Sequence, residues 1–367
     1  MMPRLVLVVV GSAFCAVALA AEGGSARLSK IEGQVWTRPV GSQEAPAVAN
    51  STVPLGTQVR TGADGAAEIS FEDGSVLRMQ KSSSILLSPS KRQKQKSSVL
   101  LFFGRIWNKV SPSGTGETSY EVSTPNAVCG VRGTQFEAQV GDDGSLRMQV
   151  TEGKVAVDGG SGDQVASPGQ QVEANEQGVE PTESSSGQES YDKWQSEKRE
   201  RIRTQGESIV KAIKGKIMSK KDKLEALLSR QKELESSRKG AEERARSGER
   251  AAIDEIKRMN AELAEIADAM ADLGDEASAQ IGIVDHFADL ANDPRFKMIG
   301  RKMIEAEAAS LRRIKADLDK MVADGTDVSI EAMDKMMDDM SKGKPTLRDD
   351  KGSAGKDLFG DDPMDMH

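Results

Sequence analysis

The stretch EDGSVLRMQ, from Glu72 to Gln80, recurs almost unchanged as DDGSLRMQV, from Asp142 to Val150. Each copy begins with acidic residues and a glycine, which favour a tight turn. Apolar residues occupy alternate positions before and after each turn, as expected for strands with one buried face. Both copies therefore predict a β-hairpin, in which glycine supplies the positive φ angle of the turn.

Burial of the apolar face also predicts the pairing within each hairpin. In the first copy, a three-residue loop from Asp73 to Ser75 would place Phe71 opposite Leu77. In the second copy, a three-residue loop from Asp142 to Gly144 aligns the two apolar sets in the same way. We expect a domain assembled from several such hairpins and short strands.

The region around these hairpins, residues 22–178, has the same character. It is rich in Gly, Val, Ser and Thr, and turn signals recur at short intervals. Many short alternating strands separated by turns are typical of all-β folds. We predict an all-β domain here, a sandwich or roll of short antiparallel strands.

The second half of the chain has a different pattern, which begins near Tyr191. No proline occurs between Pro181 and Pro294, and helix-forming residues dominate. Apolar residues recur at alternating spacings of three and four, which is typical of helices packed against other helices. Two such seams are Ile256, Met259, Leu263, Ile266, Met270 and Leu273, and Leu311, Ile314, Leu318 and Met321. Residues 191–341 are therefore predicted to form an α-helical bundle or coiled coil, and the fold class is α+β in separate regions.

The remaining segments are assigned by composition. Residues 179–190 are predicted to be a flexible linker, and residues 342–367 a disordered tail. Residues 1–21 resemble a secretory signal peptide, with Arg4, an apolar run and small residues before a cleavage site near Ala20. After cleavage, Cys129 would be the remaining cysteine, so no intrachain disulfide could form, and we expect its thiol to be buried.

Export would place the protein in the periplasm or outside the cell. The alternative is an uncleaved N-terminus that anchors the protein in the inner membrane and faces it toward the periplasm. Membrane contact is expected only in that alternative.

One run of residues resembles a known family. The segment AVCGVRGTQF, from Ala127 to Phe136, is followed by VTEGKVAV, from Val150 to Val157, and this combination resembles the FecR domain family. The resemblance extends roughly over residues 28–175. The positions that we single out as the family motif are Gly130, Val131, Arg132, Gly133, Thr134, Phe136, Glu152 and Gly153.

The resemblance implies an exported β-rich domain that binds or senses a ligand in the periplasm. The best-known members span the membrane and relay a signal from an outer-membrane transporter to a cytoplasmic sigma factor. Here the apolar run already begins at Leu5, so we expect a stand-alone exported protein instead.

The motif allows two roles for its residues. In one, Arg132 contacts a ligand, and the glycines allow that ligand to approach the backbone closely. In the other, the glycines form a bulge or tight corner, and Arg132 pairs with a carboxylate or with carbonyl groups of the domain itself. We prefer the structural role. We also expect the basic run 91–96 to be a solvated loop, and Phe102, Phe103 and Trp107 to fill the β core.

Catalysis has little support in the sequence. The two histidines are His286 and His367, and neither lies in the β region. Clustered Cys and His residues and glycine-rich nucleotide motifs are also missing, so we expect no enzyme activity, cofactor or metal. A net charge of −8, spread along the chain, argues against nucleic acid as a partner.

We therefore expect a non-enzymatic exported cell-envelope protein. Its β domain would bind or sense an envelope protein or a glycan, and its helices would mediate docking or homo-oligomer formation. The alternative is a membrane-anchored signal-transduction regulator of the FecR type.

Overall fold

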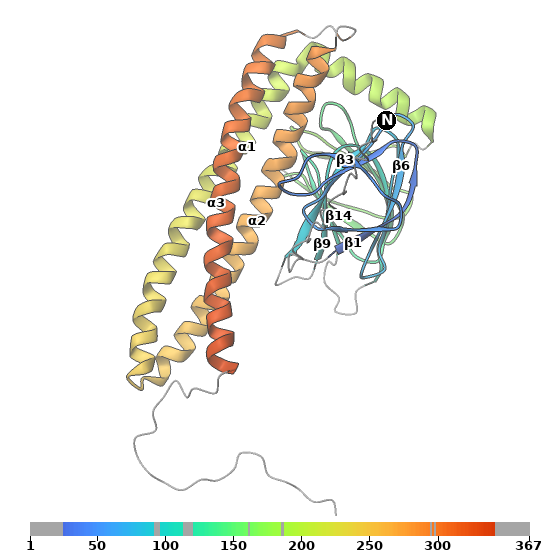
Figure 1. Cartoon of the computed structure of the whole chain (residues 1–367). Helices are drawn as coiled ribbons and strands as arrows, with labels where there is room; N and C mark the ends of the chain where they lie inside the picture. The colour runs from blue at the N-terminus through green and yellow to red at the C-terminus, as the bar shows by residue number, and fades with distance from the viewer. Residues whose placement is uncertain are drawn as a thin grey trace, which may run out of the picture.

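The computed structural model describes residues 25–341, except 92–95, 113–119, 161, 185–186, 294–295 and 297–298. A β-rich region is followed by three long helices that lie along one side of it (Figure 1). The predicted fold class, α+β in separate regions, is confirmed. The predicted signal peptide, the predicted tail and most of the basic run 91–96 lie outside the described residues.

The strands of the β region are short, apart from β9. They are β1 (Ser25–Glu32), β2 (Val35–Arg38), β3 (Ala45–Pro46), β4 (Ser51–Pro54), β5 (Gln58–Thr61), β6 (Ala66–Phe71), β7 (Val76–Met79), β8 (Ser84–Lys91), β9 (Lys96–Lys109), β10 (Tyr120–Ser123), β11 (Val128–Val131), β12 (Gln135–Val140), β13 (Leu146–Glu152), β14 (Val155–Asp158), β15 (Asp163–Ala166), β16 (Gln171–Ala174) and β17 (Val179–Thr182).

The strands form two layers that share β9. One layer runs in the order β4, β1, β6, β7, β9, β12, β13, β16, β17. The other runs β3, β2, β5, β8, β9, β10, β11, β14, β15. Neighbouring strands are antiparallel, with the exception of β9 and β10. Strand β9 therefore joins an N-terminal half of the domain to a C-terminal half in both layers.

Strand β9 passes from one layer to the other at Gly104. Its first part pairs with β8 and β10, and its last part with β7 and β12. Gly104 has a φ of +100°, and a Cβ atom there would lie 2.5 Å from the Cα of Ser83. This close approach of two backbones requires glycine.

Alternate residues of the strands fill the space between the layers. Leu28, Ile69, Leu77, Phe136 and Met148 are fully buried in this core. Cys129 is buried as predicted, and burial raises the pKa of its thiol to about 12.

The large aromatic residues of β9 do not fill this core, so that prediction is wrong. Phe102, Phe103 and Trp107 are each half-buried. Ile106 and Asn108 point inward, so the two-residue period of the strand directs Trp107 to the outer face. There its ring lies 4.9 Å from the guanidinium of Arg78.

Both predicted hairpins form, and in both a three-residue loop connects the strands. The second has the predicted pairing, with Val140 opposite Leu146. In the first, the predicted pairing is shifted by two residues, because Leu77 lies opposite Ile69 instead of Phe71. A two-residue shift keeps the apolar residues on one face, so burial alone could not distinguish the two registers.

The turn itself selects the register. In the first hairpin the Asp73 Oδ1 accepts the Ser75 N–H at 2.8 Å, and in the second the Asp143 Oδ1 accepts the Ser145 N–H at 2.9 Å. Both turns then place a glycine at φ +82°. The repeated phrase is thus the same Asx-type turn built twice.

The connection to the helices is shorter than the sequence suggested. Residues 179–182 pair with β16 as strand β17, and the first helix begins at Gln188. The predicted linker at 179–190 is therefore largely replaced by regular structure. Val179 packs against the β core, and this burial outweighs the polar composition of the segment.

Three helices complete the fold: α1 (Gln188–Arg246), α2 (Arg250–Asn292) and α3 (Arg301–Ser341). The first turns of α1 cross one end of the β domain before the helix runs alongside α2 and α3 (Figure 1). Seam residues such as Ile213, Met270 and Leu311 are buried in one shared cluster. The seams thus meet within a single chain, as a bundle. None of the helices in the described part of the chain is long and apolar enough to cross a membrane.

Candidate functional site

The turns of the two hairpins, each with the sequence Asp-Gly-Ser, lie at opposite ends of the layer that contains both hairpins. Lys109, at the end of β9, pairs with Val76 beside the first turn. Gly104, in the middle of β9, pairs with Val140 beside the second turn. The first turn is exposed, whereas the second is buried beneath the helices. The turns thus share a local structure and differ in their surroundings.

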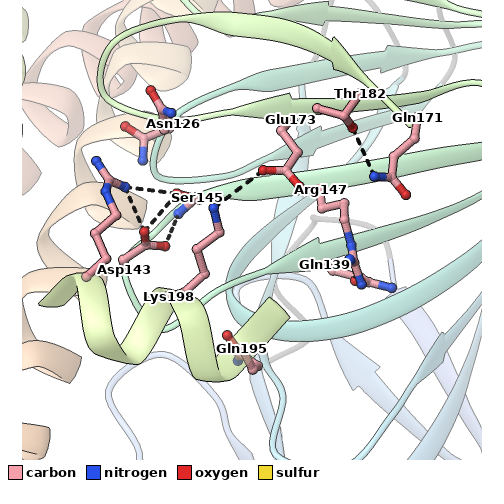
Figure 2. A network of polar contacts seen from close by, with 12 residues as sticks. Asn126, Gln139, Asp143, Ser145, Arg147, Gln171, Glu173, Thr182, Gln195 and Lys198 are labelled. Carbon is pink, nitrogen blue, oxygen red and sulfur yellow. Dashed lines mark hydrogen bonds and ion pairs between the residues drawn. The ribbon is translucent and has the colours of Figure 1, made fainter. Parts of the chain in front are cut away.

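The Asp143 side chain is fully buried at the base of α1. Its Oδ2 accepts a hydrogen bond at 2.7 Å from Nη1 of Arg201, and the Ser145 hydroxyl also donates to it (Figure 2). Arg201 forms a second ion pair with Glu176, in the turn between β16 and β17. One guanidinium therefore holds two separate turns of the β domain against the helix.

Asp142 forms a second set of contacts with the helices. Its carboxylate pairs with Arg199 of α1 and lies 2.9 Å from Nε2 of His286 in α2. Its backbone N–H donates to the Gln195 side chain at 3.1 Å. Burial alone would raise the pKa of the Asp142 carboxyl, but the contacts with His286 and Arg199 outweigh it and lower the pKa.

A third group of contacts surrounds Trp194 in α1. The guanidinium of Arg147 lies 4.8 Å from its ring, and the Lys198 ammonium lies 5.2 Å from it. Arg147 also donates to Gln139 at 2.8 Å, and Lys198 pairs with Glu173 at 3.4 Å (Figure 2). Strands β12, β13 and β16 thus meet the start of α1 through cation–π and polar contacts.

The aromatic pair of β9 supplies the apolar part of the contact with α2. Phe103 stacks on His286 with ring centroids 4.4 Å apart. Phe102 lies against Gly282, where a Cβ atom would come within 2.5 Å of its ring. These aromatic residues serve the contact between domains, which explains why they are missing from the β core.

We call this set of contacts the docking cluster: Asp142, Asp143, Ser145, Arg147, Glu173, Glu176, Trp194, Lys198, Arg199, Arg201 and His286, with Phe102, Phe103 and Gly282 beside them. In the described part of the chain, no hydroxyl or thiol is hydrogen-bonded to His286. The same residues contain no group of three or more His, Cys, Asp or Glu side chains suited to a metal ion. The cluster joins two parts of the molecule and fixes their relative position.

The family-motif positions lie elsewhere. Gly133 and Gly153 have φ angles of +57° and +80°, and they meet at a corner closed by Thr134. The Thr134 hydroxyl lies 3.1 Å from the carbonyl of Lys154, and a Cβ atom on Gly153 would come within 2.8 Å of that hydroxyl. This geometry fits the structural role of the motif glycines.

The other motif residues are divided between the core and the surface. Val131 and Phe136 are buried in the β core, and Gly130 is half-buried in β11. Arg132 and Glu152 are exposed, and Glu152 accepts a hydrogen bond from Gln135. The structure does not bring these residues together with the docking cluster.

Sequence reasoning missed the cationic half of the docking cluster. Its main members, Arg199 and Arg201, belong to the run KRERIR at residues 198–203. A dense basic run directly after the β region, together with the paired acids Asp142 and Asp143, was the available signal. The first hairpin also has an acidic pair, Glu72 and Asp73, so the acids alone do not distinguish the two turns.

Acid should weaken the docking cluster through Asp142. Because the folded-state pKa of this carboxyl is lowered, its contribution to stability is complete above the unfolded-state pKa of about 3.9 and is lost as pH falls through the folded-state value. We expect Asp142→Asn to destabilise the protein near neutral pH, and by progressively less below about pH 4. Urea unfolding of both proteins across this range would measure the difference. A gap that persists unchanged at pH 3 would contradict the assignment.

The fold and the docking cluster define a two-part protein, in which a β domain is locked to a helical bundle. Residues 57–156 match the family model described as FecR protein. The matched span contains every position of the predicted motif, so the FecR domain resemblance is confirmed over these residues. The helices lie outside the match.

Part of the chain also aligns with two solved structures. Two crystal structures, at 2.50 and 1.65 Å, of a "putative anti-sigma factor from Parabacteroides distasonis ATCC 8503" align with TM-scores of 0.31 and 0.30 and identities of 19% and 18%. Each alignment covers 34% of this chain and 59% of the other. No curated protein matches the chain.

Proposed function

We propose that this protein is a non-enzymatic, exported cell-envelope protein. Its FecR-like β domain binds or senses a ligand, and its helical bundle docks a partner. The FecR match supports the first part. The docking cluster supports coupling between the two parts, because Arg199, Arg201 and His286 fix one turn of the β domain to two helices.

The charged character of the cluster suits transmission between the two parts. Its central carboxylates, those of Asp142 and Asp143, are buried and hold the two parts in one relative position. A ligand that shifts the β domain would therefore also move the bundle. The partner contacted by the bundle is an envelope protein in this proposal.

Self-association through the helical seams is less favoured. The seam residues are already buried against one another within one chain. A homo-oligomer would have to use the outer helical surface, where exposed pairs such as Arg244 with Glu255 and Arg230 with Glu262 dominate.

Photo-cross-linking in the producing cell tests the docking role. A photoreactive residue at Lys257, on an exposed face of α2, should capture an envelope protein of defined mass. The same residue at Val40, which is 80% exposed on the β domain, is the control and should not capture that protein. Capture of a second copy at Lys257 would favour the homo-oligomer, and a protein confined to the cytosol would overturn the proposal.

The FecR match also favours a second candidate, a membrane-anchored regulator. Sequencing the N-terminus of the mature protein separates the two. A mature chain that starts near Ala21 supports the exported module, and one that retains the apolar run from Leu5 supports the regulator.

A further inference from the structure

A cleft of about 610 Å³ lies between the β domain and the helices, apart from the docking cluster's aromatic contacts. One wall consists of Lys216, Lys220 and Lys223, which follow one another along α1. The facing wall is formed by the turns that precede β11 and follow β14 and β16. Gln280 of α2 also lines it. None of these residues belongs to the FecR motif.

Two residues that line the cleft each have a buried side-chain oxygen atom without a hydrogen-bond donor among the described residues. These atoms are Oε1 of Gln280, a residue only 4% exposed, and Oε2 of Glu176. The Gln280 amide is held in place because its Nε2 donates to the carbonyl of Pro125 at 3.1 Å. Buried acceptors are costly to leave unpaired, and in the wall of a cleft a bound molecule can supply the missing donor.

The lysines of the cleft, in contrast, have N–H donors to spare. Lys216 donates to Asn126 at 3.3 Å, and Lys220 pairs with Glu276 at 3.1 Å. An ammonium group has three N–H donors, so each contact leaves others for a further acceptor. The cleft therefore presents unpaired acceptors and spare donors side by side.

The charges of the cleft nearly balance. Three lysines line it together with four carboxylates, those of Asp158, Asp163, Glu176 and Glu276. A strongly anionic ligand would meet these carboxylates, and a strongly cationic one would meet the lysines. A neutral ligand is favoured.

We propose that this cleft binds a saccharide. A hydroxyl group both donates to acceptors such as Gln280 Oε1 and accepts from ammonium groups, and it carries no charge. The cleft volume lies in the range of small-molecule sites, roughly 300–1,000 Å³. This inference deepens the binding role proposed above and rests on it.

Isothermal titration of the full chain with maltotetraose and with chitotetraose tests the proposal. We expect one of them to bind, and Gln280→Met to weaken that binding by about tenfold or more, since the acceptor is lost. Gln231→Met is the matched control. Gln231 is also a buried glutamine that donates to a backbone carbonyl, that of Gly325, and has an unpaired Oε1, but it lies in the helical bundle.

Lys223→Met offers a second variant, because this exposed lysine on the cleft wall is not needed for folding. It should weaken binding several-fold. No binding of either saccharide to the wild-type chain, or equal binding by wild type, Gln280→Met and Lys223→Met, would overturn the proposal. Cosedimentation with purified cell-wall sacculi then separates a polymeric glycan from a free sugar. Photo-cross-linking at Lys257 does not depend on the cleft. A partner captured there would therefore still support the proposed docking role if the saccharide proposal failed.

Discussion

Asp143→Asn is expected to lower the free energy of unfolding by about 2–4 kcal/mol. Asparagine keeps the oxygen that accepts the Ser145 N–H, so the turn itself can form. The substitution removes the charge that faces Arg201, which is largely buried and retains Glu176 as its second partner. Urea unfolding would measure the loss. It can be followed by circular dichroism of the helices and by tryptophan fluorescence, because Trp194 lies in the same contact.

The repeated turn provides the matched control. Asp73→Asn makes the same chemical change in a turn with the same hydrogen bond, but this aspartate is exposed and faces no helix. We expect an effect within about 0.5 kcal/mol. Equal losses in the two variants would show that the turn, and not the docking contact, accounts for the effect at Asp143.

Hydrogen exchange would locate the change at Asp143. Amides in the first turns of α1, from Gln188 to Arg203, should exchange faster in Asp143→Asn than in wild type. Amides of β9 should be affected less, because that strand is held by neighbours on both sides and opens only when the domain unfolds. A uniform increase over the whole chain would indicate general destabilisation and not loosened docking.

The strands and helices could be predicted from the sequence where the local pattern of residues determines them. Alternating apolar residues around a glycine turn specify a hairpin with one buried face, and this was sufficient for Phe136, Met148 and Val150. Spacings of three and four specified the helical half in the same way. In the first hairpin, however, two registers bury the same side chains, and only the Asp73 turn contact distinguishes them.

The docking cluster was not predictable, because it depends on where distant segments meet. Asp142 and His286 are 144 residues apart, and nothing in the sequence near either residue specifies the other. The aromatic residues of β9 show the same difficulty. From the sequence alone, a phenylalanine on a strand is expected to be buried in the β core. Here Phe102 instead packs against Gly282 of a helix that is distant in the sequence.

Strand β9 is the element on which both layers depend, so a change at its crossing point should be severe. Gly104→Ala is expected to destabilise the β domain by about 3–5 kcal/mol, from an unfavourable φ of +100° combined with overlap against Ser83. For a domain of this size, such a loss lowers the melting temperature by roughly 10 °C. Thermal unfolding followed by circular dichroism would measure it.

The control for Gly104→Ala is a glycine with a positive φ but no neighbours. Gly169 has a φ of +79° in the turn before β16, and nothing lies within 4 Å of the position that a Cβ atom would occupy there. Gly169→Ala should therefore cost only the backbone strain, about 1 kcal/mol. If the two alanine variants melt together, the contact between Gly104 and Ser83 does not hold the layers. Strand β9 would then cross between them without the close backbone approach that we assign to it.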